Sequence, residues 1–273
     1  MNKPSPAPLK AVILAAGVGS RIRPLTDDCP KSLLSVAGKP ILERMISNCN
    51  SCGISEFILI LGYLDHRIRD FVATVFPKID VTYVVNEKYA ETNTGYSLML
   101  AAEAIGGTGF IKFDADVVFD NKILHRLIRS PFEVTLCIDR GIELDAEEVK
   151  IIVDDQFRVL RASKDVEPKE ALGESIGIEK INADTAKHLF AELAQMMTQA
   201  DHHQAYYEVA YERLIAKGFT FHALDITGLN WTEIDTHCDF VSANKMFAIP
   251  PRARAPKHQH LLNTASIRGF RRV

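Results

Sequence analysis

Two glycines and several cations follow the first apolar segment of the chain. Residues 11–14 are apolar, and Gly17, Gly19, Arg21 and Lys31 come soon after them. Backbone N–H groups at a glycine-bearing strand end, together with fixed cations, are suited to binding a polyphosphate. The segment therefore predicts a phosphate-binding loop.

This loop fits neither of two common phosphate-binding motifs. A dinucleotide-binding motif requires a third glycine where Ile22 stands and a helix directly after it, whereas Pro24 and Pro30 favour extended backbone. A P-loop requires a glycine before Lys31, but Pro30 stands there and lacks the N–H that phosphate would use. We therefore expect a long, open loop at a strand end, where functional loops concentrate. The alternative is a surface loop with solvated arginines.

Two pairs of acidic residues form a second candidate site. Asp114 and Asp116 stand at the carboxyl end of an expected strand, where open α/β sheets bind ligands, and alternation along the strand directs both to one side. Glu233 and Asp235 repeat this spacing. Carboxylate oxygens suit Mg²⁺ that is shared with substrate phosphates. The alternatives are a turn at Asp114 or Asp116 and helix capping by Asp235 or Thr236.

The segment from Ala15 to Leu42 resembles the signature of the nucleotidyltransferase superfamily. It contains, in order, Gly17, Gly19, Arg21, Pro24, Thr26, Pro30, Lys31, Gly38, Lys39 and Pro40. Residues 86–89, 93–98 and 233–235 are similar to the branch that contains phosphocholine, inositol-phosphate and aminoethylphosphonate cytidylyltransferases. The resemblance extends over residues 9–248.

The resemblance implies a Mg²⁺-dependent enzyme that transfers CMP from CTP to a phospho-alcohol or phosphonate and releases pyrophosphate. It places the metal on Asp116 and Asp235, Arg21 on the triphosphate and the leaving pyrophosphate, and Lys31 on the attacking and α-phosphate groups. The nucleotide is expected to contact Leu14, Ala15, Ala16, Gly17, Gly19, Asn86, Asn93, Thr94, Ser97 and Asp114. Two alternatives stay open: a sugar-1-phosphate uridylyl- or thymidylyltransferase, and a non-catalytic nucleotide-binding regulatory relative.

The acceptor site is expected later in the chain. Tyr206, Tyr207 and Glu208 stand at the start of an expected helix, and aromatic faces beside a carboxylate suit an ammonium group, with core packing of the tyrosines as the alternative. Gln204 stands where the phosphocholine-specific pattern has an aspartate, which weakens the case for phosphocholine. The predicted acceptor contacts are Glu174, Ser175, Gly177, Glu179, Tyr207, Glu208 and Glu233.

Apolar periodicity predicts the elements that position these motifs. Strands are expected at 10–15, 57–61, 81–85, 110–113 and 134–139, with helices at 40–49, 97–105, 121–129 and one that Asp65 caps. This alternation predicts an α/β fold with a mostly parallel, doubly wound sheet, and the resemblance implies a Rossmann-like nucleotidyltransferase fold. A hairpin at 149–153 and 158–162 and a strand at 175–181 indicate a small antiparallel patch. Helices at 184–197, 205–217 and 236–246 and a strand at 220–224 complete the prediction.

Composition limits the class of protein. The chain has 273 residues, of which 47% are hydrophobic, so it can bury a large core. It contains no apolar run of membrane-spanning length and no apolar signal core near its start, so we expect no membrane insertion and a cytoplasmic location. Five cysteines, an odd number, favour reduced thiols, and one Cys49-x-x-Cys52 pair is a weak metal motif.

The expected organisation is one nucleotidyltransferase domain over 9–248, between a flexible tail at 1–8 and a basic tail at 249–273. The second tail has five arginines, one lysine and no acidic residue, whereas the whole chain carries a net charge of −3. A solvated extension, an arm of a homodimer and an arm that reaches an anionic substrate are alternatives for it. The acidic remainder and the absence of a recognised module argue against a nucleic-acid partner.

Overall fold

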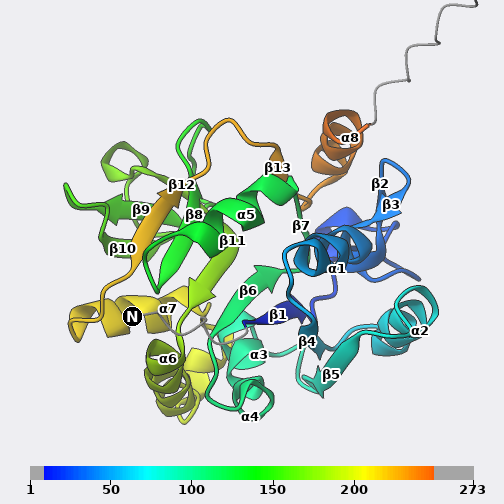
Figure 1. Ribbon diagram of the computed structural model, residues 1–273, viewed down its shortest axis with the longest axis horizontal. Helices are drawn as coiled ribbons and strands as arrows, with labels where there is room; N and C mark the ends of the chain where they lie inside the picture. The colour runs from blue at the N-terminus through cyan, green and yellow to red at the C-terminus, as the bar shows by residue number, and fades with distance from the viewer. Residues whose placement is uncertain (1–8, 249–273) are drawn as a thin grey trace, which may run out of the picture.

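The apolar segments pair into one nine-stranded sheet in the computed structural model, which describes residues 9–248 (Figure 1). Four neighbouring strands are parallel and lie in the order β6 (Phe110–Asp114), β1 (Lys10–Ala15), β4 (Glu56–Leu61) and β5 (Asp80–Val85). This parallel part confirms the predicted α/β fold. The tails predicted at 1–8 and 249–273 lie outside the described residues.

Antiparallel strands continue the same sheet beyond β6. β11 (Gly173–Ile181) runs antiparallel to β6, to β8 (Thr135–Asp139) and to β9 (Lys150–Val153). The predicted hairpin is β9 with β10 (Val159–Ser163), and β12 (His222–Asp225) runs parallel to β8. The antiparallel patch is therefore joined to the parallel part through β11.

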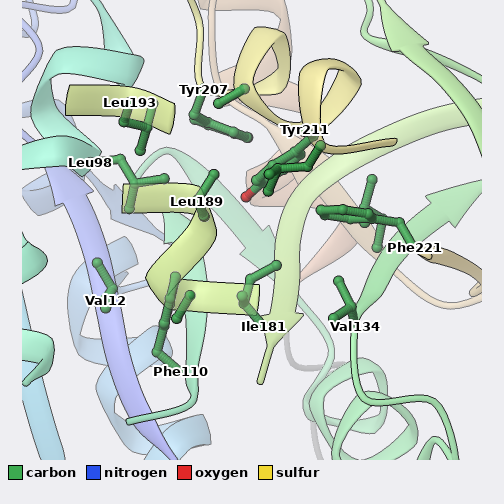
Figure 2. Close-up of a cluster of buried hydrophobic side chains, with 14 of the residues drawn as sticks. Val12, Leu98, Phe110, Val134, Ile181, Leu189, Leu193, Tyr207, Tyr211 and Phe221 are labelled. Atoms are coloured by element: carbon green, nitrogen blue, oxygen red, sulfur yellow. The ribbon is translucent and has the colours of Figure 1, made fainter. Parts of the chain in front are cut away.

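Helices cover both faces because side chains alternate along each strand. Ala11 and Ile13 pack in one core with α1 (Ile41–Ser51), α2 (Asp65–Val75) and α5 (Asn121–Arg129). Val12 and Leu14 pack in the opposite core with α3 (Thr94–Leu100), α4 (Ala102–Ile105), α6 (Ala183–Met196) and α7 (Glu208–Ala216). Figure 2 shows this second core, in which Leu98, Leu189 and Tyr211 are labelled. The sheet is doubly wound, as predicted.

Two short strand pairs were missed by the sequence patterns. β7 (Val117–Phe119) pairs antiparallel with β13 (Trp231–Glu233), and β2 (Ser35–Val36) pairs with β3 (Lys39–Pro40). Strands this short hold too few side chains for an alternation to be recognised. The β7–β13 pair matters for the site, because it brings the acidic residues near position 116 beside those near position 233.

The prediction that Asp65 caps a helix is wrong. Leu64, with φ +50°, precedes the first helical residue, and Asp65 is already inside α2, where its carboxylate accepts from Arg69 Nε at 2.9 Å. The helix expected at 97–105 instead begins at Thr94, because the Asn93 side chain accepts from the Thr94 N–H, and it divides at Ala101 into α3 and α4.

The remaining helices agree with the predicted pattern. α7 begins three residues later than expected, and α8 (His237–Met246) follows a capping box formed by Thr236 and Asp239. Among residues 9–248, no helix combines the length and the apolar character that crossing a membrane requires.

A third, smaller apolar cluster joins the N-terminal loop to the last described helix. Its buried members are Ile22, Leu34, Val36, Ile41, Val118, Ile234 and Ala243. Three of them are close neighbours in sequence of predicted site residues: Ile22 of Arg21, Val118 of Asp116, and Ile234 of Asp235. Burial of these side chains therefore holds the backbone beside each charged residue.

Gly177 offers a test of how tightly β11 packs against the site. It has φ +72°, and a Cβ added there would lie 2.5 Å from Asp114 Oδ2. Gly218 has φ +91° and open space around it, so Gly218→Ala is a matched control for backbone strain alone. We expect Gly218→Ala to lose about 1 kcal/mol of unfolding free energy and Gly177→Ala to lose about 1–3 kcal/mol more, through the clash with Asp114. Urea unfolding measures both, and equal losses would contradict the predicted clash.

Candidate active site

A cavity of about 440 Å³ lies at the carboxyl ends of β1 and β6. Its wall brings together every predicted site residue except Asn86 and Glu179. Those on the wall are Leu14, Ala15, Ala16, Gly17, Gly19, Arg21, Lys31, Asn93, Thr94, Ser97, Asp114, Asp116, Glu174, Ser175, Gly177, Tyr207, Glu208, Glu233 and Asp235.

The predicted phosphate loop folds back on itself at Gly19. This residue has φ +64°, and a Cβ there would lie 3.3 Å from Lys31 Cβ. Thr26 Oγ1 donates to the Gly19 carbonyl at 2.8 Å. Because residue 19 is a glycine, Lys31 can pack directly against the start of the loop, although the two residues are twelve positions apart in the sequence.

Three carboxylates gather on one side of the cavity. Asp116, Glu233 and Asp235 each offer an oxygen, and these oxygens lie within 4.8 Å of one another. The β7–β13 pair places Val117 opposite Glu233, and the Ile234 N–H donates to the Asp116 carbonyl at 3.2 Å. Strand β6 ends at Asp114, so a turn, rather than the predicted alternation along the strand, directs Asp116 into the cavity.

Lys31 and Arg21 form hydrogen bonds with two of these carboxylates, those of Asp116 and Asp235. Lys31 Nζ donates to Asp116 Oδ2 at 2.7 Å and to Asp235 Oδ1 at 2.6 Å, and Arg21 donates to Asp235 Oδ2 at 2.6 Å. Burial alone would lower the pKa of Lys31, but the two carboxylates outweigh it and raise this pKa above its ordinary value. Loss of hydration in the crowded site, together with the charges of Asp116 and Asp235, raises the pKa of Glu233 to about 9. The site is thus short of positive charge even with Lys31 in place.

The carboxylate group fits a hard divalent cation. All its donors are oxygens, and Asp116 Oδ1 is buried without a hydrogen-bond partner among residues 9–248. Oxygen ligands of this kind suit Mg²⁺. Within that part of the chain no other group of three metal-binding side chains meets the same spacing, and Cys49 and Cys52 are free thiols.

Lys112 and its partners form a buried charged cluster behind the cavity wall. The sequence patterns did not predict this cluster. The Lys112 side chain has no exposed surface, and Nζ donates to Asp114 Oδ2 at 2.8 Å, pairs with Glu179 Oε2 at 2.9 Å and donates to the Tyr207 hydroxyl. Tyr207 in turn donates to Asp114 Oδ2 at 2.8 Å. Glu179 therefore lies behind the cavity, not on its wall as expected of an acceptor contact. The available signal was a lysine within the apolar segment of β6.

Asn86 also lies behind the wall. It is 1% exposed, and its amide donates to Thr92 Oγ1 and Ser97 Oγ, both at 3.0 Å. Thr92 and Ser97 line the cavity. Asn86 therefore positions wall residues and does not line the cavity as the nucleotide contact that the sequence predicts. A buried asparagine satisfies its own polar atoms in this way.

Glu174, Tyr206, Tyr207 and Glu208 form an acidic and aromatic part of the wall. We name it the acceptor end, because the sequence predicts that it binds the acceptor. Burial raises the pKa of Glu208 to about 7, and burial together with nearby acidic groups raises the pKa of Glu174 to about 8. Lys164 lies with Nζ 4.9 Å from the centre of the Tyr206 ring. Lys164 was not a predicted site residue, since a single lysine in a loop carries no sequence signal.

Trp231 and Gln204 lie away from the cavity. Trp231 Nε1 donates to Asp139 Oδ2 at 2.6 Å. Gln204 Nε2 donates to the Glu91 carbonyl at 2.6 Å. The residue that departs from the phosphocholine pattern therefore acts on the loop that leads to Asn93, not on the wall itself.

Residues 10–140 match the sequence profile of the Nucleotidyl transferase family. CMP-5'-(3-aminopropyl)phosphonate synthase from Streptomyces rubellomurinus is 29% identical over 91% of this chain and 40% of its own length. Choline-phosphate cytidylyltransferase from Streptococcus pneumoniae is 39% identical over 45% of this chain and 52% of its own length. The chain thus spans about half the length, or less, of the curated relatives it matches.

Solved structures share the fold. CTP:phosphocholine cytidylyltransferase from Streptococcus pneumoniae has a TM-score of 0.71 at 26% identity, over 87% of this chain and 98% of that chain. The inositol-1-phosphate CTP transferase of T. maritima has a TM-score of 0.72 at 18% identity, over 89% and 99% of the two chains. The predicted resemblance is confirmed: this chain has the nucleotidyl transferase family profile over residues 10–140 and a nucleotidyltransferase fold over the residues that the structure describes.

Proposed function

We propose that this chain is a Mg²⁺-dependent cytidylyltransferase that transfers CMP from CTP to a phosphonate or phospho-alcohol and releases pyrophosphate. The observation that carries the proposal is the convergence of Lys31 and Arg21 on the Asp116 and Asp235 carboxylates within one cavity. Cytidylyl transfer is favoured because two similar proteins are named as cytidylyltransferase or CMP-phosphonate synthase.

Charge explains why such a site suits this reaction. An acceptor oxygen attacks the α-phosphorus of CTP, a new P–O bond forms, the bond to the β-phosphate oxygen breaks, and pyrophosphate leaves with its electron pair. Both reactants are anions, so positioning and neutralisation of charge provide the catalysis. In this proposal Lys31 binds the attacking and α-phosphate groups, and Arg21 binds the triphosphate and the departing pyrophosphate.

Asp116 and Asp235, with Glu233 beside them, are the proposed holders of Mg²⁺. When bound, Mg²⁺ would supply neutralisation of phosphate charge. A bound cation would favour the ionised form of Glu233, whose pKa is raised to about 9 in the free protein. Backbone groups between Ala16 and Gly19 complete the proposed nucleotide site.

The experiment that tests the function is pyrophosphate release with CTP, UTP, dTTP and ATP, each combined with 2-aminoethylphosphonate, phosphocholine, inositol phosphate and glucose 1-phosphate. Turnover with CTP and a phosphonate or phospho-alcohol is the expected result. Turnover confined to UTP or dTTP with glucose 1-phosphate would overturn cytidylyl transfer in favour of a sugar nucleotidyltransferase. Absence of turnover with every pair would favour a nucleotide-binding relative.

Loss of the Lys31 ammonium should slow the reaction itself. We expect Lys31→Ala and Arg21→Ala each to lower kcat by at least about 10²-fold, as loss of a transition-state contact does. Arg23→Ala is the matched control, because Arg23 lies in the same loop, is 54% exposed at its side chain and pairs with Asp27 at 3.3 Å. Steady-state kinetics measure all three variants. A Lys31→Ala variant that retains the turnover of Arg23→Ala would contradict the assigned role.

Metal binding should depend on the same carboxylates. Asp116→Asn and Asp235→Asn each remove a charged oxygen ligand, so we expect the Kd for Mn²⁺ in the presence of CTP to rise by at least about tenfold. Asp225→Asn is the control, since Asp225 pairs with Arg140 at 3.3 Å outside the cavity. Electron paramagnetic resonance of free Mn²⁺ gives the Kd. Equal affinities for all three variants would refute the metal site.

A further inference from the structure

The acceptor end of the cavity holds buried carboxylates that lack donors. Glu208 is 7% exposed, and its Oε2 is enclosed without a hydrogen-bond partner among residues 9–248. Glu174 is 9% exposed, lines the same cavity, and within that region forms no side-chain hydrogen bond or ion pair. An enclosed carboxylate oxygen without a donor costs free energy, so Glu208 calls for a ligand that supplies N–H or O–H groups.

The aromatic groups at this end are already in contact with cations. Lys164 Nζ lies 4.9 Å from the Tyr206 ring centre, and Lys112 Nζ lies 3.7 Å from the Tyr207 ring centre. The third tyrosine on the wall, Tyr89, packs against Tyr63 with ring centres 6.3 Å apart. A trimethylammonium group has no N–H and is bound mainly by open aromatic faces. Of the two tyrosines at this end, Tyr207 is buried, and Tyr206, which is 40% exposed, already has Lys164 over its ring. Glu208 Oε2, by contrast, is an acceptor without a donor among residues 9–248.

We propose that the acceptor carries a primary ammonium group and that Glu208 and Glu174 accept its N–H donors. This inference rests on the proposed cytidylyl transfer and specifies its second substrate as an aminoalkyl phosphonate or aminoalkyl phosphate. A primary ammonium offers three N–H donors, and the enclosed Glu208 Oε2 has no other donor among residues 9–248. Its positive charge also offsets the cost of holding ionised carboxylates in a buried wall. A quaternary ammonium supplies the charge but leaves the enclosed Glu208 oxygen without a donor.

The test compares three acceptors that differ at one group: 2-aminoethylphosphonate, its N,N,N-trimethyl analogue and ethylphosphonate. With CTP and Mg²⁺, we expect kcat/KM for the primary amine to exceed that for the trimethyl analogue by at least about 10²-fold, because a site built for hydrogen bonds rejects analogues that lack the donors. Equal or greater kcat/KM for the trimethyl analogue would overturn the inference and leave cytidylyl transfer standing. Absence of pyrophosphate release with all three would overturn the transfer reaction itself.

The Glu208→Gln variant tests whether Glu208 is responsible for the preference for a primary ammonium group. It should raise KM for 2-aminoethylphosphonate by at least about tenfold, as loss of a charge-assisted contact does, with little change for ethylphosphonate. Glu212→Gln is the matched control, because Glu212 lies one turn further along α7 and pairs with Arg161 outside the cavity. Equal KM values for both variants would refute the role of Glu208. Should Glu208→Gln fail to fold in a thermal melt, the three-acceptor comparison with the unmodified protein still decides the inference.

Discussion

Three carboxyl groups lie close together in the cavity, and the rest of the site depends on how the fold holds them there. At about 4 Å and an effective dielectric constant of about 20, two carboxylates repel each other by about 4 kcal/mol. Lys31 offsets this repulsion by donating to both Asp116 and Asp235. The cluster of Ile22, Val118 and Ile234 holds the adjoining backbone through burial. Apolar packing thus stabilises a group of charges that would otherwise separate.

The same principle operates one layer deeper, where Lys112 is fully buried. A lysine there would be destabilising without partners, and Asp114, Glu179 and Tyr207 supply them. These partners come from β6, from β11 and from the residue before α7. Lys112 therefore connects the strand that precedes Asp116 to the helix that begins with Glu208. If this strand or this helix moved, the contacts of Lys112 would change. The movement would therefore also affect the element at the other end of the cavity.

Much of this arrangement could be predicted from the sequence, and the exceptions have physical causes. Long apolar segments revealed the strands, and the glycine and cation spacing revealed the phosphate loop. β7 and β13 escaped recognition because three residues carry too little pattern. Asn86 and Glu179 were expected on the wall because their side chains suit ligands, yet the same polar atoms suit buried partners equally well. Residue type fixes what a side chain can bind, whereas packing decides whether a ligand or the protein binds it.

The charges along the cavity differ in one respect that matters for the substrate. At the nucleotide end Lys31 and Arg21 are paired with carboxylates, so a phosphate group or a metal ion must exchange with partners already present. At the acceptor end Glu208 retains an enclosed oxygen with no donor among the described residues. An acceptor with an anionic head and a cationic tail meets cations at one end and carboxylates at the other. Both interactions favour the same orientation, with the anionic oxygen toward Lys31, and this is the orientation that attack on the α-phosphorus of CTP requires.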